Sequence, residues 1–143
     1  MNVLIDTNVF LDDALNRMPN AIEANKVCDL IDNNKINGYI SANSVTDIYY
    51  VVGKKKNEAV ARKMIKSLLC NHTIVSIDGE ACLAALDKPI EDFEDALVVV
   101  CAEKANLDYI VTNDKEFLSL DLPVPSISPS DFLIVYAGLE GDK

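Results

Sequence analysis

The sequence predicts a three-layer α/β/α domain, in which helices cover both faces of a central parallel sheet of four to five strands. Short apolar runs recur along the chain and alternate with longer, one-sided apolar patterns, as strands alternate with helices in such folds. The 143 residues suit one domain, 1–143, and no repeat or linker divides them. Half of the residues are apolar and a quarter are charged, which excludes a disordered or fibrous chain.

The expected strands are short and apolar, and several are rich in Val and Ile. Nearly continuous apolar strands are typical of parallel sheets, because such strands are buried on both faces. In chain order these strands are expected at 2–5, 39–40, 73–77, 109–111 and 124–127.

Three helices are expected in the first part of the chain. The first, over 9–16, ends at a Met-Pro-Asn break, and the second, over 21–33, carries its apolar residues on one side. Ser41 or Asn43 can cap the third, which runs to about residue 52.

The later helices have clearer boundaries. Gly53 and the lysines after it are expected to separate the third helix from the fourth, and Pro89 opens a turn before the most apolar helix. That helix is almost without polar residues after Asp95, which predicts burial nearly all round. These helices are expected at 57–70, 79–86, 93–105, 115–118 and 130–136.

The cysteines and the single histidine do not indicate a zinc site. No CxxC pair is present, and His72 has no closely spaced partner. We interpret all four cysteines as reduced residues of the core, because free cysteine packs as a small hydrophobic residue. They are Cys28, Cys70, Cys82 and Cys101.

No apolar run approaches the ~20 residues that a membrane-spanning helix needs. The N-terminus, Met1 to Asp6, lacks the basic start and the long apolar stretch of a signal peptide. We therefore expect a cytoplasmic protein without a membrane partner.

The net charge of −10 argues against binding nucleic acid through phosphate contacts alone. The basic residues are nevertheless uneven, because six of the 13 fall in one short segment. An ordinary solvated helix face explains this segment, whereas an RNA-binding role would also include Lys115, directly after Asp114. The candidate RNA-binding residues are Lys54, Lys55, Lys56, Arg62, Lys63, Lys66 and Lys115.

Two strands end in the same three residue types. The strand at 3–5 leads into Asp6-Thr7-Asn8, and the strand at 109–111 leads into Thr112-Asn113-Asp114. Ligands of parallel α/β folds bind beyond the carboxyl ends of the strands, so we expect Asp6 and Asp114 on one rim of the sheet. Each aspartate could instead simply cap the helical segment that follows it.

Two further carboxylate positions lie on apolar helices. Asp95 lies where the most apolar helix enters the core, with Asp92 three residues earlier, although acidic residues are also common in a first helical turn. Asp47 lies in the largely apolar helix that follows the second strand, where an exposed position is equally plausible. Carboxylates are rarely buried without a partner.

Together these motifs resemble the PIN domain, a nuclease family that includes VapC-type toxins. The resemblance runs from Asn2 to about Phe117. Its markers are Ile5-Asp6-Thr7-Asn8, the segment 41–47 ending in Thr46-Asp47, Asp92-Phe93-Glu94-Asp95-Ala96 and Thr112-Asn113-Asp114.

The resemblance implies that Asp6, Asp47, Asp95 and Asp114 form the acidic catalytic quartet. It also implies supporting roles for Asn8, Asp92 and Thr112. The second acid is often glutamate in the family, so the shorter Asp47 is expected to act through a bound water.

Converging carboxylates repel one another unless they bind protons or a cation. Ligation by oxygen alone suits Mg²⁺ or Mn²⁺, which we expect Asp6, Asp95 and Asp114 to hold. The expected activity is metal-dependent hydrolysis of phosphodiester bonds in single-stranded RNA. The resemblance further implies a homodimer and, for a toxin, a cognate antitoxin protein that blocks the acidic rim.

Two alternatives remain open at this stage. The chain could be a catalytically weak or inactive PIN-fold module that binds protein or RNA, because Asp47 departs from the common pattern. It could also be an aspartate-nucleophile phosphatase, but these enzymes need a second aspartate two positions after the first, where this chain has Asn8.

Overall fold

A computed structural model describes residues 1–142, which form five strands and eight helices. All five strands are parallel and lie in one sheet in the order β3-β2-β1-β4-β5. This confirms the predicted α/β architecture. The strands are β1 (Asn2–Ile5), β2 (Asn37–Ser41), β3 (His72–Val75), β4 (Tyr109–Val111) and β5 (Ser126–Ile127).

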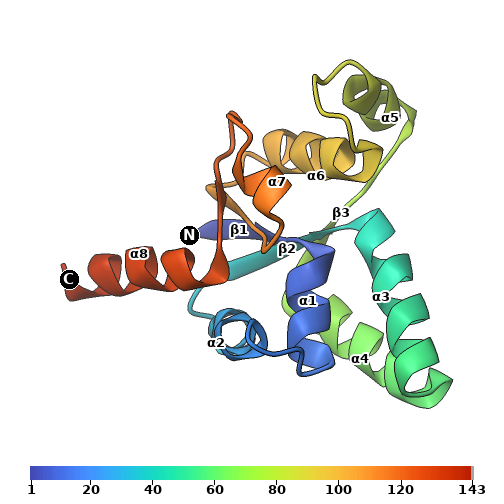
Figure 1. The fold of residues 1–143 in the computed structure, drawn as a ribbon, viewed down its shortest axis with the longest axis vertical. Helices are drawn as coiled ribbons and strands as arrows, with labels where there is room; N and C mark the ends of the chain where they lie inside the picture. The colour runs from blue at the N-terminus through green and yellow to red at the C-terminus, as the bar shows by residue number, and fades with distance from the viewer. Residues whose placement is uncertain (143) are drawn as a thin grey trace.

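Helices cover both faces of the sheet (Figure 1). Helices α5, α6 and α7 lie on one side, and α1, α2, α3 and α4 lie on the other, with α8 extending beyond the sheet. The helices are α1 (Thr7–Ala14), α2 (Ala21–Asp32), α3 (Ala42–Lys55), α4 (Glu58–Asn71), α5 (Gly79–Leu86), α6 (Phe93–Lys104), α7 (Lys115–Leu118) and α8 (Pro129–Gly141).

Strand β1 shows how the two faces share the core. Side chains alternate along a strand, so Val3 and Ile5 pack into one apolar cluster with α1, α2 and α3, whereas Leu4 packs into the other with α6. All three side chains are fully buried. Helix α6 is buried from Ala96 to Ala102, as its apolar sequence predicted.

The strand order places a crevice beside β1. The chain moves outward in one direction from β1 to β2 and β3, and then crosses to the other side of β1 to form β4 and β5. Ile5 is in register with Val111, so β1 and β4 end at the same edge of the sheet. A ligand of a parallel sheet binds where the strand order reverses in this way.

Several boundaries differ from the predictions. Helix α3 continues through Gly53 to Lys55, so the glycine does not end it. Helix α1 begins at Thr7 because Asp6 caps it, and α8 is longer than expected, with Pro129 in its first turn. Strand β5 contains only Ser126 and Ile127.

The prediction that all four cysteines belong to the core was wrong for Cys70 and was met only in part by Cys82, which packs against a buried cluster but is itself partly exposed. Cys28 and Cys101 are buried, but Cys70 is exposed near the end of α4 and Cys82 is half-buried on α5. Over the described part of the chain, no helix is long and apolar enough to cross a membrane.

Candidate active site

Asp6 follows β1 and is 8% exposed. One carboxylate oxygen, Oδ1, accepts a hydrogen bond of 2.9 Å from the Thr7 backbone N–H, and Oδ2 accepts one of 2.8 Å from the Thr112 hydroxyl. Thr112 is fully buried after β4, so a side chain 106 residues away along the chain fixes the Asp6 carboxylate.

The segment after β4 carries the second carboxylate, Asp114. Its backbone N–H donates to the Thr112 hydroxyl at 3.1 Å, and its Oδ1 accepts from the Glu116 N–H at 2.9 Å. The Asn113 N–H donates a long bond of 3.4 Å to Asn8 Oδ1. These bonds join the Asp6-Thr7-Asn8 and Thr112-Asn113-Asp114 segments, as their shared position at the strand ends predicted.

Helix α6 brings its acidic first turn to the same cleft. Asp92 is the N-cap, and its Oδ1 accepts a hydrogen bond of 3.1 Å from the Asp95 N–H. Asp95 is half-buried, and Glu94, between them, is exposed but also lines the cleft. Asp92 therefore both caps its helix and lines the cleft, as Asp6 and Asp114 also do.

Helix α3 contributes Asp47, which is half-buried. A chain of hydroxyl groups anchors the start of this helix to α1. Thr7 Oγ1 donates to Ser44 Oγ at 2.7 Å, and Ser44 Oγ lies 2.9 Å from Ser41 Oγ. Ser41 and Ser44 are buried, so the network fixes how the starts of α1 and α3 lie beside each other.

These four elements enclose a cleft of about 370 Å³. Its acidic lining consists of Asp6, Asp47, Asp92, Glu94, Asp95 and Asp114. The supporting residue Asn8 also lines it, whereas Thr112 lies behind Asp6. The side chains as they stand do not form a closed metal cage, because no three Asp, Glu, His or Cys residues within 1–142 are grouped closely enough to hold an ion.

The electrostatics of the cleft follow from this crowding. Burial raises the pKa of Asp95 to about 7, with further contributions from the charges of Asp92, Asp6, Asp114 and Glu94. Burial also raises the pKa of Asp6, although its hydrogen bonds from Thr112 and Thr7 act in the opposite direction. The pKa of Glu94 is raised by burial and then by Asp47 and Asp92. A bound cation would favour the charged forms of all these carboxylates.

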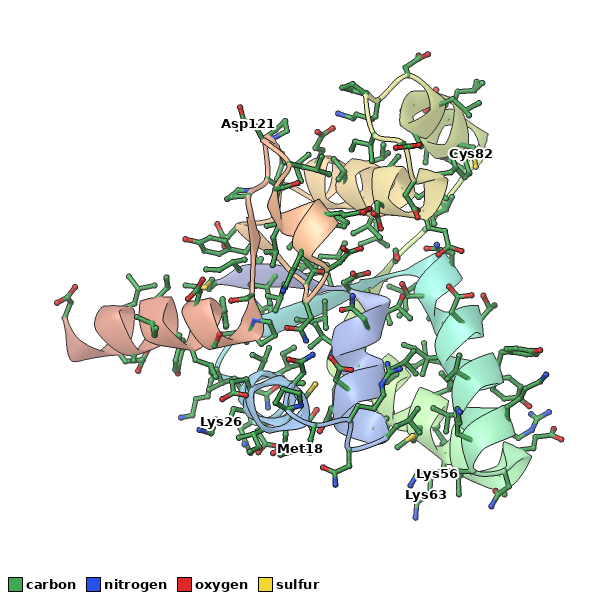
Figure 2. The ribbon with its side chains drawn as sticks, in the orientation of Figure 1. Met18, Lys26, Lys56, Lys63, Cys82 and Asp121 are labelled. Carbon is green, nitrogen blue, oxygen red and sulfur yellow. The ribbon has the colours of Figure 1, made fainter. Side chains whose placement is uncertain are left out.

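The predicted basic residues do not line this cleft. Lys56 and Lys63 lie at the end of the α3–α4 pair that is far from the sheet (Figure 2). Lys54 and Arg62 form cation–π contacts with the rings of Tyr50 and Tyr49, respectively. Arg62 also pairs with Glu58 at 3.0 Å on the exposed surface. Lys115, although adjacent to Asp114 in sequence, is absent from the described lining. An RNA-binding role for these residues stays a prediction.

Several lining or supporting residues were not predicted. Glu94 was available from the sequence, because it lies in the acidic segment before the apolar helix, and Ser44 lies in the segment that leads to Asp47. Arg17 also lines the cleft, held by the buried carboxylate of Asp12. No motif in the sequence marks this pair as part of the site.

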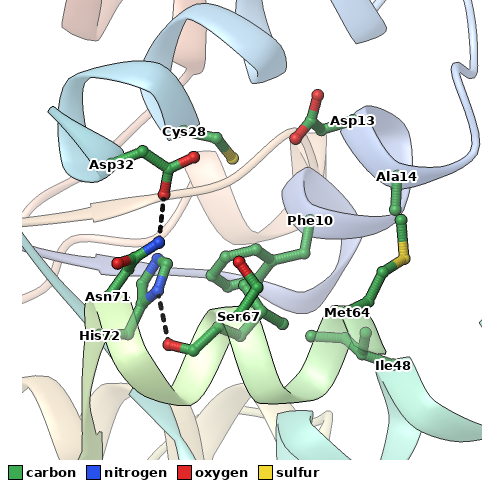
Figure 3. Close-up of a pocket in the computed structure, with 11 residues that line it drawn as sticks. Phe10, Asp13, Ala14, Cys28, Asp32, Ile48, Met64, Ser67, Asn71 and His72 are labelled. Carbon is green, nitrogen blue, oxygen red and sulfur yellow. Dashed lines mark hydrogen bonds between the residues drawn. The ribbon is translucent and has the colours of Figure 1, made fainter. Parts of the chain in front are cut away.

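A second hollow, of about 150 Å³, lies beside His72 (Figure 3). His72 Nδ1 is 3.0 Å from the Leu68 carbonyl oxygen, and the His72 ring packs edge-on against Phe10 at 5.1 Å. Its Nε2 has no hydrogen-bond partner within residues 1–142. Burial lowers the pKa of His72 and raises that of Cys28. Neither change activates a nucleophile, because each favours the neutral form.

The sequence matches the family model described as PIN domain over residues 2–116, and the chain belongs to this family. Ribonuclease VapC1 of Aquifex aeolicus (strain VF5) is 29% identical over 126 residues, which cover 85% of this chain and 88% of that protein.

Solved structures share the fold. A chain in the structure of VapBC2 from Rickettsia felis, bound to a DNA fragment from its promoter, has a TM-score of 0.66 and 19% identity, covering 90% of this chain and 98% of that one. A chain in a toxin–antitoxin complex from Klebsiella pneumoniae has a TM-score of 0.67 and 16% identity. The match covers 89% of this chain and 97% of that one.

Proposed function

We propose that this protein is a divalent-metal-dependent ribonuclease that hydrolyses phosphodiester bonds of single-stranded RNA. The observation that carries the proposal is the gathering of six carboxylates from four parts of the chain around one cleft. The similarity to Ribonuclease VapC1 supports RNA as the substrate. The expected homodimer and cytoplasmic location are part of the same proposal.

The chemistry of the donor set fits Mg²⁺ or Mn²⁺. Carboxylate and amide oxygens dominate the cleft, and its described lining contains neither His nor Cys. Asp6, Asp95 and Asp114 would hold the ion, and Asp47 and Asp92 would complete the set through bound water. When bound, the ion would lower the pKa of a water molecule and stabilise the charge that develops on the phosphate.

The protein's own hydrogen bonds prepare these carboxylates for that role. Asp6, Asp92 and Asp114 each use Oδ1 to accept a backbone N–H, which fixes the plane of the carboxylate. The three Oδ2 atoms differ in their hydrogen bonding. Asp6 Oδ2 is oriented by Thr112, while Asp92 and Asp114 have no hydrogen bond to Oδ2 from the described residues and can turn this atom toward a ligand.

We also propose that the protein is the toxin of a toxin–antitoxin pair. The structures that share its fold include chains from VapBC and toxin–antitoxin complexes. A cognate antitoxin would inhibit it by covering the acidic cleft. Purification of the protein together with the product of a neighbouring gene, and loss of RNA cleavage in that complex, would test this assignment.

Cleavage of a mixed-sequence, single-stranded RNA in the presence of Mn²⁺ or Mg²⁺ tests the proposed activity. We expect the wild-type protein to cleave this RNA. The rate for Asp6→Asn should be at least about 100-fold lower, because Asp6 is the most buried carboxylate of the cleft. Asp29→Asn is the matched control, since Asp29 is exposed on α2 and lies outside the cleft. Equal rates for wild type and Asp6→Asn would exclude the proposed role of Asp6.

A catalytically weak or inactive PIN-fold binding module is the second candidate. Two observations favour it: Asp47 is one methylene shorter than the glutamate common at this position, and the described carboxylates do not enclose an ion as they stand. Such a module would bind RNA or protein without metal-dependent cleavage.

A further inference from the structure

Arg17 is the one cationic side chain that lines the acidic cleft in the described part of the chain. We infer that Arg17 binds a phosphate group of the RNA strand next to the phosphate that is cleaved, and that the buried carboxylate of Asp12 positions it. The inference rests on the proposed ribonuclease function and adds a substrate-binding residue outside the carboxylate cluster.

The position of Arg17 is fixed from two sides. Its Nε lies 3.1 Å from Asp12 Oδ1, and its backbone N–H donates to the Asp12 carbonyl oxygen at 2.9 Å. Asp12 is 6% exposed, so this ion pair is better shielded from solvent than a pair on the open surface. The segment after α1 is therefore folded back so that the arginine side chain returns toward the cleft.

The pairing leaves the end of the guanidinium group available. The ion-pair contact of Asp12 is to Nε, at 3.1 Å, and within residues 1–142 neither Nη1 nor Nη2 donates a hydrogen bond. The Arg17 side chain is 45% exposed. A guanidinium group whose Nη1 and Nη2 donate no hydrogen bond to the protein is suited to bind two oxygens of one phosphate.

The other oxygen of Asp12 connects Arg17 to the segment that carries Asp114. Asn113 Nδ2 donates to Asp12 Oδ2 at 2.8 Å, and Asn113 directly precedes Asp114. Asp12 therefore joins the two sides of this part of the cleft, α1 and the segment after β4. A carboxylate that forms an ion pair with an arginine and accepts a hydrogen bond from an asparagine fixes both side chains more firmly than either interaction alone.

The spacing along α1 separates Arg17 from the carboxylate cluster. Asp12 follows Asp6 by six residues, which corresponds to about 9 Å along a helix. Because Arg17 pairs with Asp12, we assign its guanidinium group to the end of the cleft away from Asp6. Arg17 is therefore placed to bind the neighbouring phosphate, where a cation also offsets the repulsion between RNA and the six carboxylates.

Steady-state cleavage of a short single-stranded RNA, measured with Mn²⁺ at several salt concentrations, tests the inference. For Arg17→Gln we expect KM to rise roughly 10-fold with kcat within about 2-fold of wild type, because a phosphate contact away from the reacting group binds substrate and transition state equally. The slope of log kcat/KM against log salt should become shallower by about 0.7, the value for one phosphate contact to a single strand.

Three further variants distinguish binding from a structural effect. Lys26→Gln removes the same unit charge from the exposed surface of α2, outside the cleft, and should leave KM and the slope unchanged (Figure 2 labels Lys26). Arg17→Lys should keep the salt slope while raising KM, because lysine retains the charge but not the two-pronged geometry. Asp12→Asn should raise KM without making the slope shallower, because the arginine charge remains but is no longer held.

The outcomes separate the inference from the proposed function. A normal KM and salt slope for Arg17→Gln, in a protein whose wild type cleaves RNA, would overturn the inference and leave the ribonuclease proposal intact. A loss confined to kcat would also overturn it, because Arg17 would then act at the reacting phosphate. Absence of cleavage by the wild type would refute the proposed function, and the inference with it.

Discussion

The acidic cleft and the hollow beside His72 both lie between helices and both enclose ionisable side chains, but their linings differ in kind. The cleft gathers six carboxylates around Asp6, with Arg17 as the cation of its described lining. The hollow is lined by apolar side chains such as Phe10 and Met64 together with polar ones that include Asp13, Asp32 and His72 (Figure 3).

The two regions differ in how burial and nearby charges change the pKa values of their ionisable groups. In the hollow, burial lowers the pKa of His72, and burial together with nearby carboxylates, Asp13 first, raises that of Cys28, so each group becomes a neutral part of the packing. In the cleft, burial and the charges of four neighbouring carboxylates act on a group that is itself a carboxylate, and the pKa of Asp95 rises to about 7. A bound cation would relieve the repulsion between the crowded carboxylates of the cleft, whereas the neutral forms of His72 and Cys28 carry no charge to offset.

The largest expected difference between the two regions is in RNA cleavage. Asp95→Asn should lower the rate by at least about 100-fold, because it removes a proposed metal ligand. His72→Phe should leave the rate within about 2-fold, because His72 lies outside the cleft and the change, although it loses the Nδ1 contact with Leu68, keeps the ring contact with Phe10. A large loss of activity in folded His72→Phe would contradict the assignment of the site to the cleft.

A smaller effect is expected from the residue behind Asp6. Thr112→Val keeps the shape of the side chain but removes the 2.8 Å hydrogen bond to Asp6 Oδ2 and the 3.1 Å bond that the hydroxyl accepts from the Asp114 N–H. We expect the Mn²⁺ concentration for half-maximal cleavage to rise about 10-fold, as for other residues that orient a metal ligand. Thr73→Val, at an exposed position of β3, is the control. An unchanged Mn²⁺ requirement would show that the Thr112 hydroxyl orients neither Asp6 nor Asp114 for metal binding.

The smallest expected effect is on the stability of the metal-free protein. Asp95 in the cleft and His72 in the hollow should contribute to stability with opposite dependence on pH. Because the folded pKa of Asp95 is raised from 3.8 to about 7, its contribution to stability is present below pH 3.8 and is lost as the pH rises toward 7. Because the folded pKa of His72 is lowered from 6.5, its contribution is present above pH 6.5 and is lost as the pH falls through the folded pKa.

Denaturant unfolding in a chelating buffer measures both contributions. The stability of Asp95→Asn relative to wild type should increase between about pH 4 and 7, and that of His72→Phe should increase as the pH falls below 6.5. The same sign of pH dependence for both variants would contradict the distinction between the regions.

Much of the cleft could be predicted because its residues follow from strand ends. Asp6 and Asp114 come directly after apolar strands, and parallel strands bring such positions to one edge. Asp95 could be predicted because the apolar sequence after it requires a buried helix. Asp47 depended on the resemblance, since half-buried and exposed positions on α3 have similar local sequence.

The rest of the site depends on tertiary contacts that the local sequence does not specify. Arg17 follows the end of α1 and reaches the cleft only because the chain turns back at Asn16, whose φ is 50°. The lysines around residue 55 are dense in sequence, but helices α3 and α4 carry Lys56 and Lys63 away from the sheet (Figure 2). Charge density along the chain therefore did not predict which cation lines the cleft.

Calorimetric titration with Mn²⁺ tests most directly whether the carboxylates act together as a cation site. We expect wild-type protein to bind Mn²⁺ with release of protons near neutral pH, because Asp95 has a pKa of about 7 in the metal-free protein. Asp95→Asn should lose most of this binding, and Asp29→Asn should keep it. Absence of Mn²⁺ binding by the wild type, or equal binding by Asp95→Asn, would contradict the account.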